Sequence, residues 1–147
     1  MKDTKQRILE IALELFARDG YEAVSVSMIA GELGITKGAL YRHYKSKRDI
    51  FDSIVERMYR LDAERSGEYR VPEKRCEEQP EEYGKTSPES IRSFTIGQFR
   101  FWTEDDFASS FRKLLTLEQF RNEEMQGLYQ QYLASGPVEY VKDLFQT

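Results

Sequence analysis

Two short helical patterns separated by a two-residue turn lie between Ser25 and Arg48, and they constrain the fold more than any other feature of the chain. Gly34 ends the first pattern, and Thr36 can cap the second only two residues later. So short a turn forces the two helices to cross steeply, and the small side chain of Ala30 lets their backbones approach. The spacing therefore predicts a helix-turn-helix.

Apolar residues at spacings of three and four predict helices before and after this motif as well. In the last part of the chain, Phe120 is expected to face a core and Gly136-Pro137 to interrupt a helix. The predicted helices outside the motif begin at Asp3 or Thr4, Ser46, Ser87-Pro88, Asp105 or Asp106, Asn122 and Val138. We found no convincing strand pattern, so the sequence predicts an all-α protein.

The order of these helices predicts an N-terminal three-helix helix-turn-helix head, joined by a long fourth helix to a helical C-terminal body. The expected boundaries are 1–48 for the DNA-binding head and 49–66 for the connecting helix. Prolines and charged residues indicate a linker over 67–87, with one short helix near 80–83, and the body occupies 88–147.

The charge of the chain is distributed unevenly. The net charge is -4, but residues 1–60 carry 11 lysines and arginines against 9 carboxylates. No acidic residue lies between Glu32 and Asp49, and the five cations in that interval are Lys37, Arg42, Lys45, Lys47 and Arg48. Because charges act over a Debye length of roughly 8 to 10 Å, this local face of +5 is expected to attract phosphate. The alternative is a solvated basic face without a partner.

The remaining composition argues against several other classes of protein. The only histidine, His43, has no neighbouring group at a catalytic or metal-ligand spacing, and one cysteine cannot form an intrachain disulfide. We therefore expect no enzymatic activity, no catalytic residue, no metal and no cofactor. Apolar runs are too short for a membrane span or a signal peptide, which predicts a cytoplasmic protein without a membrane partner.

An ordered set of glycines, caps and aromatic residues in the head resembles the TetR family of bacterial one-component transcriptional regulators. The resemblance is ungapped over roughly the first 55 residues, and it is carried by Gly20-Tyr21, Ser25, Ile29-Ala30, Gly34-Ile35-Thr36-Lys37-Gly38, Leu40-Tyr41 and His43-Tyr44-Lys45-Ser46-Lys47. It implies a ligand-responsive regulator, most simply a repressor, that binds a palindromic operator in double-stranded DNA as a homodimer.

The resemblance also implies which residues contact DNA: Ser25, Thr36, Lys37, Gly38, Tyr41, His43 and Lys47. The start of the recognition helix would meet base edges in the major groove, with Lys37 as the candidate for a guanine. Tyr41 and His43 would lie against the sugar-phosphate backbone. Ser25 and Lys47 would contact phosphates. Tyr44, by contrast, is expected to belong to the core.

Aromatic residues in the body could border a pocket for a small apolar or aromatic effector, as the resemblance implies. The candidates for that pocket are Phe99, Trp102, Phe111, Glu118 and Tyr129. The alternative for each aromatic residue is an ordinary core position. Glu118 is the acid most able to face inward on its helix, although we favour a solvated position for it.

Family members pair through a four-helix bundle of two late helices from each subunit, and this chain ends about where the first would begin. We expect either a homodimer built from the helices that are present or a shortened protein whose dimer is weakened or absent. The alternative function is a shortened interaction protein that binds DNA weakly or without sequence preference and does not respond to an effector.

Overall fold

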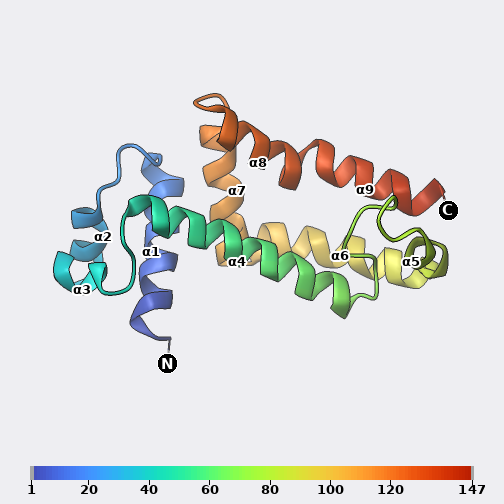
Figure 1. The fold of residues 1–147 in the computed structure, drawn as a ribbon, viewed down its shortest axis with the longest axis horizontal. Coiled ribbons are helices and arrows are strands. Elements are labelled where there is room, and N and C mark those ends of the chain that lie inside the picture. Colours follow the sequence, from blue (N-terminus) through green and yellow to red (C-terminus); the bar gives the residue numbers. More distant parts are fainter. Residues whose placement is uncertain (1, 147) are drawn as a thin grey trace.

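The computed structural model describes residues 2–146 and contains nine α-helices and no strand within that range (Figure 1). The all-α prediction is confirmed. The helices are α1 (Thr4–Asp19), α2 (Val26–Leu33), α3 (Lys37–Tyr41), α4 (Lys47–Glu68), α5 (Pro80–Lys85), α6 (Pro88–Glu104), α7 (Asp106–Glu118), α8 (Glu123–Leu133) and α9 (Ser135–Gln146).

Seven of these helices begin at a side chain that satisfies an otherwise unpaired backbone amide. In each case the side-chain oxygen of the N-cap accepts a hydrogen bond from the amide three residues later, which is the ordinary preference of Ser, Thr, Asp and Asn at this position. The capping residues are Asp3, Ser25, Thr36, Ser46, Ser87, Asp105 and Asn122. The predicted helix starts at these positions are confirmed.

Helices α1 to α3 form the head, which lies at one end of the molecule (Figure 1). Its core consists of apolar side chains from all three helices, including Phe16, Ile29 and Leu40. Tyr44 is buried too, as predicted, and its hydroxyl donates a hydrogen bond to the Lys5 carbonyl oxygen at 3.1 Å. Burial raises the pKa of Tyr44 to about 12, so its phenol stays neutral and keeps α1 fixed against the segment after α3.

Helices α6 to α9 form the body, and α7 is the helix through which it meets the head. In Figure 1, α4 and α6 run lengthwise, α8 and α9 run along the opposite edge, and α7 crosses between them beside α1. The packing of α7 against α1 is the most extensive helix pair in the fold. Phe111, Leu114 and Leu115 are completely buried there. The connecting helix α4 also packs on α1.

The segment between α4 and α6 is packed against α9. The predicted short helix is present as α5, and Tyr83 within it is 2% exposed. Its hydroxyl donates to the Lys74 carbonyl oxygen at 2.8 Å, and the Tyr140 hydroxyl of α9 donates to the Pro72 carbonyl oxygen at 2.6 Å. Aromatic hydroxyls thus fix a segment that has few aliphatic residues of its own.

Two expectations for the body were wrong. Phe120 is 88% exposed, because α7 ends at Glu118 and the turn that follows does not continue its buried face. The break before the last helix falls at Ala134, and Gly136 and Pro137 lie in the first turn of α9. A proline is tolerated there because the amides of a first turn have no partner within the helix.

Candidate nucleic-acid interface

The turn between α2 and α3 presents the start of α3 to solvent. Gly34 adopts the left-handed conformation with φ 67° and ψ 30°, which ends α2, and Thr36 begins α3 by accepting the Ala39 amide at 3.0 Å. Lys37 and Gly38 follow directly, and both are exposed. The residues predicted to meet base edges therefore stand together at the accessible N-terminus of a short helix.

The residues predicted to contact the DNA backbone lie close to this start in the chain and are accessible. Ser25 is exposed and accepts the Met28 amide at 3.1 Å, so its hydroxyl lies at the positive end of α2. Tyr41 is 47% exposed at the end of α3, and His43 follows it on the surface. Each side chain could reach a phosphate or sugar without displacing a core residue.

Three of the five cations predicted to form a basic face are free to contact an anion. Lys37, Arg42 and Lys45 are exposed, and no carboxylate within residues 2–146 lies at ion-pair distance from their side chains. Such side chains keep their full charge for a phosphate partner, and the acidic body lies away from them (Figure 1).

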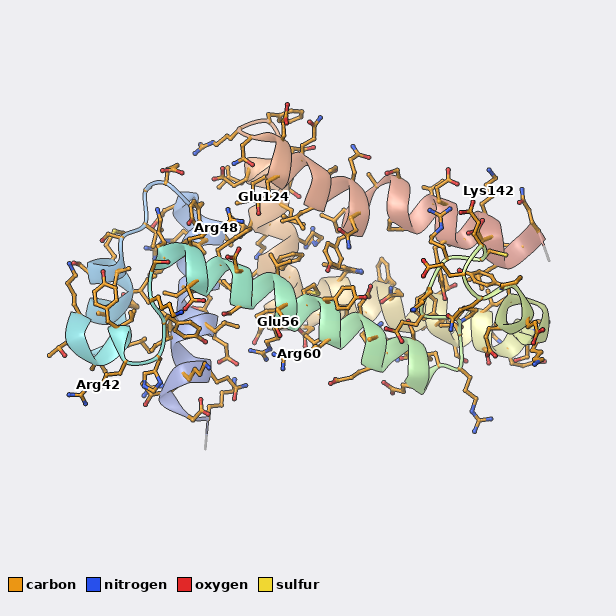
Figure 2. All side chains as sticks on the ribbon, in the orientation of Figure 1. Arg42, Arg48, Glu56, Arg60, Glu124 and Lys142 are labelled. Carbon is orange, nitrogen blue, oxygen red and sulfur yellow. The ribbon has the colours of Figure 1, made fainter. Side chains whose placement is uncertain are left out.

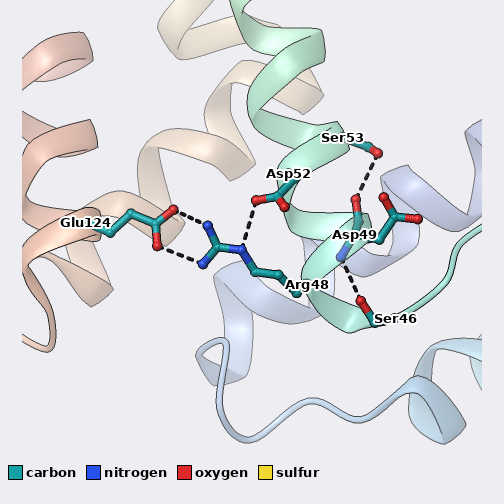
Figure 3. A network of polar contacts seen from close by, with 6 residues as sticks. All are labelled: Ser46, Arg48, Asp49, Asp52, Ser53 and Glu124. Atoms are coloured by element: carbon teal, nitrogen blue, oxygen red, sulfur yellow. Dashed lines mark hydrogen bonds and ion pairs between the residues drawn. The ribbon is translucent and has the colours of Figure 1, made fainter.

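Arg48 does not belong to this face, so the prediction of five cations was wrong by one. Its side chain points away from Arg42 and toward the body (Figure 2). Its Nε donates to Asp52 at 2.9 Å, its Nη1 donates to Glu124 Oε2 at 2.7 Å, and its Nη2 also donates to Glu124 (Figure 3). This bidentate hydrogen bonding raises the Arg48 pKa and lowers that of Glu124. Two carboxylates thus already neutralise Arg48.

Lys47 is partly engaged inside the protein. Its Nζ donates to the Tyr21 carbonyl oxygen at 2.9 Å and lies 4.2 Å from the centre of the Tyr21 ring. An ammonium group has three donors, so two remain for a phosphate. Lys47 therefore holds its charge at a fixed point beside the connection between α1 and α2.

The residues predicted to border an effector pocket are only partly brought together. The rings of Trp102 and Phe111 both lie near the ring of Tyr132, with centres 6.4 and 5.3 Å from its centre, and Tyr129 packs partly buried against the same core. Phe99 is 71% exposed on α6, so it lines no interior site, and this part of the prediction was wrong. It occupies a different face of α6 from the buried Phe94 and Phe101.

Glu118 faces inward, toward the head, and the favoured expectation of a solvated position was wrong. It is 1% exposed, and its Oε1 accepts the Tyr21 amide at 3.1 Å. Arg121 lies 3.5 Å from the same oxygen. A carboxylate this deeply buried needs such partners, because desolvation disfavours its charge. Sequence reasoning did not find the contact with Tyr21, although the adjacent Gly20 is a signal that backbone approaches another group closely.

No group of three or more His, Cys, Asp or Glu side chains within residues 2–146 is arranged to hold a metal ion. No helix among those residues is long and apolar enough to cross a membrane.

The head is similar to known proteins of one family. Residues 8–54 match the family model described as bacterial regulatory proteins, tetR family. An HTH-type transcriptional regulator of Staphylococcus aureus (strain USA300) is 48% identical over 56 residues, which are 38% of this chain and 30% of that protein. A protein of the same kind from strain NCTC 8325 / PS 47 matches equally well. The chain thus matches about a third of the length of these relatives.

Solved structures resemble nearly the whole chain. A transcriptional regulator (TerR/AcrR family) from Aquifex aeolicus VF5 has a TM-score of 0.65 at 23% identity, over 98% of this chain and 72% of that one. A gamma-butyrolactone receptor (ArpA-like protein) has a TM-score of 0.60 at 22% identity, over 95% of this chain and 68% of that one. At these identities the likeness shows one thing, namely that the head and body of this chain together have the same fold as these solved structures.

Proposed function

We propose that the chain belongs to the TetR family of bacterial regulatory proteins, whose model matches residues 8–54 of the head, and that it is a transcriptional regulator that binds double-stranded DNA sequence-specifically. The observation that carries this proposal is the capped and accessible start of α3, where Thr36, Lys37 and Gly38 stand clear of the core. The family that the head matches is one of regulatory proteins, and an enzymatic activity is no part of the proposal.

In the proposed complex, α3 enters the major groove and Lys37 donates to a guanine. Tyr41 and His43 lie along the sugar-phosphate backbone, while Ser25 and Lys47 contact phosphates. The position of Lys47 supports its role, because its bond to the Tyr21 carbonyl holds the ammonium in place and leaves two donors. Arg42 and Lys45 add unpaired positive charge to the same short segment.

We further propose that a homodimer binds a palindromic operator and that a small apolar or aromatic effector releases it, so that the protein acts as a repressor. Two copies of the head would read half-sites about 34 to 36 Å apart, or a multiple of that distance. The effector would contact the aromatic cluster of the body around Trp102, Phe111 and Tyr129. Sedimentation at micromolar concentration tests the dimer, and a strict monomer would favour the alternative of a weak, unregulated DNA-binding protein.

Selection of bound duplexes from a randomised pool tests the DNA-binding proposal. The protein is expected to enrich one sequence, and Lys37→Ala should relax the preference at one base position at a cost of about 1 to 3 kcal/mol. Lys113→Ala is the matched control, since Lys113 is an exposed lysine on α7 of the body. Enrichment of no sequence by the wild-type protein, or equal effects of the two variants, would refute the proposal.

A further inference from the structure

We propose that two carboxylates of the body, Glu118 and Glu124, position the head, and that regulation reaches it through the end of α7 and the start of α8. The proposal rests on the proposed function, since it concerns how DNA binding is controlled. Glu118 contacts the connection between α1 and α2, and Glu124 contacts the first turn of α4. Their partners lie 97 and 76 residues away in the sequence.

Glu118 holds the connection between α1 and α2 by its backbone. Its buried Oε1 accepts the Tyr21 amide at 3.1 Å, and the exposed Arg121 supplies a cation 3.5 Å away. Removing that amide would leave a buried carboxylate with one long ion pair, which is unfavourable. The carboxylate therefore fixes the distance between α7 and the connection that leads into the helix-turn-helix.

Gly20 makes this approach possible. Its φ is +89°, and a Cβ added to it would lie 2.9 Å from Glu118 Oε1 and 3.3 Å from Arg121 Nη1. Any side chain at this position would have to push the carboxylate away. The absence of a side chain at Gly20 thus lets backbone of the head rest directly on an acid of the body.

Tyr21 connects the contact with Glu118 to α4. Its carbonyl oxygen accepts Lys47 Nζ at 2.9 Å, and its ring lies between Phe16 of α1 and Phe51 of α4, with ring centres 5.1 and 5.5 Å away. The amide and the carbonyl oxygen of one residue are thus bound by the body and by the start of α4. A shift of Glu118 would move Tyr21 and, through it, the charge of Lys47.

Glu124 forms the second attachment, at the start of α8. Its two oxygens accept both terminal nitrogens of Arg48, whose Nε is held by Asp52 one turn along α4 (Figure 3). A bidentate arginine–carboxylate pair fixes direction as well as distance. Since Arg48 directly follows Lys47, both attachments act on the first turn of α4, which follows α3 in the chain.

Charge reversal at the second attachment tests the proposal without disturbing the core. Arg48 and Glu124 side chains are 53% and 47% exposed, so Arg48→Glu, Glu124→Arg and the double exchange should all fold. Lys142 and Glu139 form the matched control, since they pair within α9 at 56% and 45% exposure. Lys142 lies on the last helix, far from Arg48 (Figure 2). All variants carry Cys76→Ser, which removes the native thiol. Spin labels are attached to cysteines introduced at the exposed positions Glu32 of α2 and Gln126 of α8.

Pulsed electron paramagnetic resonance then measures the distance between head and body. Each single reversal should broaden or shift the distance distribution, and the double exchange Arg48→Glu with Glu124→Arg should restore it. The same reversals at Lys142 and Glu139 should leave it unchanged. A distribution that keeps both its wild-type mean distance and its wild-type width in both single variants would overturn the proposal, because a merely stabilising pair need not set orientation.

DNA binding provides the second measurement, with the duplex selected by the wild-type protein and a scrambled duplex as probes. Each single reversal should lower the ratio of the affinity for the selected duplex to the affinity for the scrambled duplex by up to about fivefold. The double exchange should restore this ratio. On the scrambled duplex alone the singles should differ in sign, since Glu124→Arg adds positive charge and Arg48→Glu removes it. The positioning role would be overturned if the ratio of the two affinities changed only according to the added or removed charge and did not recover in the double exchange.

The two proposals fail in distinguishable ways. If the wild-type protein selects no duplex, the proposed function fails, while the distance measurement still tests the attachment. If the wild-type protein selects a duplex but the reversals leave both distance and affinity ratio unchanged, only the positioning role fails. Glu118→Gln gives a further readout, because loss of its charge should speed hydrogen exchange at the Tyr21 amide relative to the other amides of the head.

Discussion

Replacing Gly20 with alanine should destabilise the protein more than the same substitution at any other glycine of the head. Gly20 has φ 89° and ψ 153°, a conformation that residues with a side chain essentially do not adopt. The new Cβ would also lie 2.9 Å from Glu118 Oε1, in a contact that is buried on both sides. Backbone strain and displacement of the carboxylate therefore act together.

The expected loss follows from these two effects. The strained backbone costs about 1 to 3 kcal/mol. Displacing Glu118 weakens its hydrogen bond with the Tyr21 amide, and hydrogen bonds to charged groups contribute about 1.5 to 3 kcal/mol. We expect Gly20→Ala to lower the free energy of unfolding by about 2.5 to 6 kcal/mol in total, which is a large part of the roughly 5 to 15 kcal/mol of an ordinary domain.

Urea denaturation followed by circular dichroism measures this loss, and Gly34→Ala is the matched control. Gly34 also has positive φ, at 67°, but a Cβ there would meet nothing within 4 Å. Its substitution should cost only about 1 to 2 kcal/mol. In a double-mutant cycle, Gly20→Ala and Glu118→Ala should be less than additive, because the second change removes the group that the first one strikes.

Equal losses for Gly20→Ala and Gly34→Ala would refute this reasoning. They would mean that the contact between Gly20 and Glu118 contributes nothing beyond backbone conformation. Strict additivity in the cycle would lead to the same conclusion.

Three further predictions concern the head and its attachment. Thr36→Ala removes the N-cap of α3 and should cost about 1 kcal/mol in urea denaturation while lowering affinity for the selected duplex; an unchanged midpoint would contradict the role of the cap. Arg48 lowers the pKa of Glu124 below its ordinary value of 4.5, so the stabilisation that Glu124 provides is present above that pH and is lost as pH falls through the lowered pKa. Glu124→Gln should therefore be less stable than wild type at pH 7 and equally stable in acid, and a difference independent of pH would argue against the pair. Arg42→Ala should reduce the salt dependence of DNA binding by about one phosphate contact, whereas Arg48→Ala should not, because Glu124 and Asp52 already neutralise Arg48; equal slopes for both would contradict the assignment.

Features that depend on neighbouring residues could be predicted from the sequence. The start of α3 at Thr36 and the left-handed Gly34 follow from residue preferences within one turn of a helix. The burial of Tyr44 follows from its position relative to Leu40 on the same helical pattern. For this reason the helix-turn-helix was predicted more completely than any other part of the fold.

Contacts between distant segments could not be predicted in the same way. Arg48 was expected to join the basic face, because its partner Glu124 lies 76 residues further along the chain. Glu118 was expected to be solvated, since nothing in its own helix pairs it with the Tyr21 amide 97 residues earlier. Phe120 continues the apolar spacing of α7, but the helix ends two residues before it. The errors at Arg48 and Glu118 concern tertiary contacts, and the error at Phe120 concerns the position at which a helix ends.

The most direct test of the proposed function is the ratio of two dissociation constants for the wild-type protein. They are measured at physiological salt, on the duplex selected from a randomised pool and on a scrambled duplex of the same composition. Sequence-specific regulators bind their sites at least about 10³-fold more tightly than other DNA. A ratio of that size, reduced by Lys37→Ala, is the predicted result. A ratio near one would contradict DNA recognition by the head.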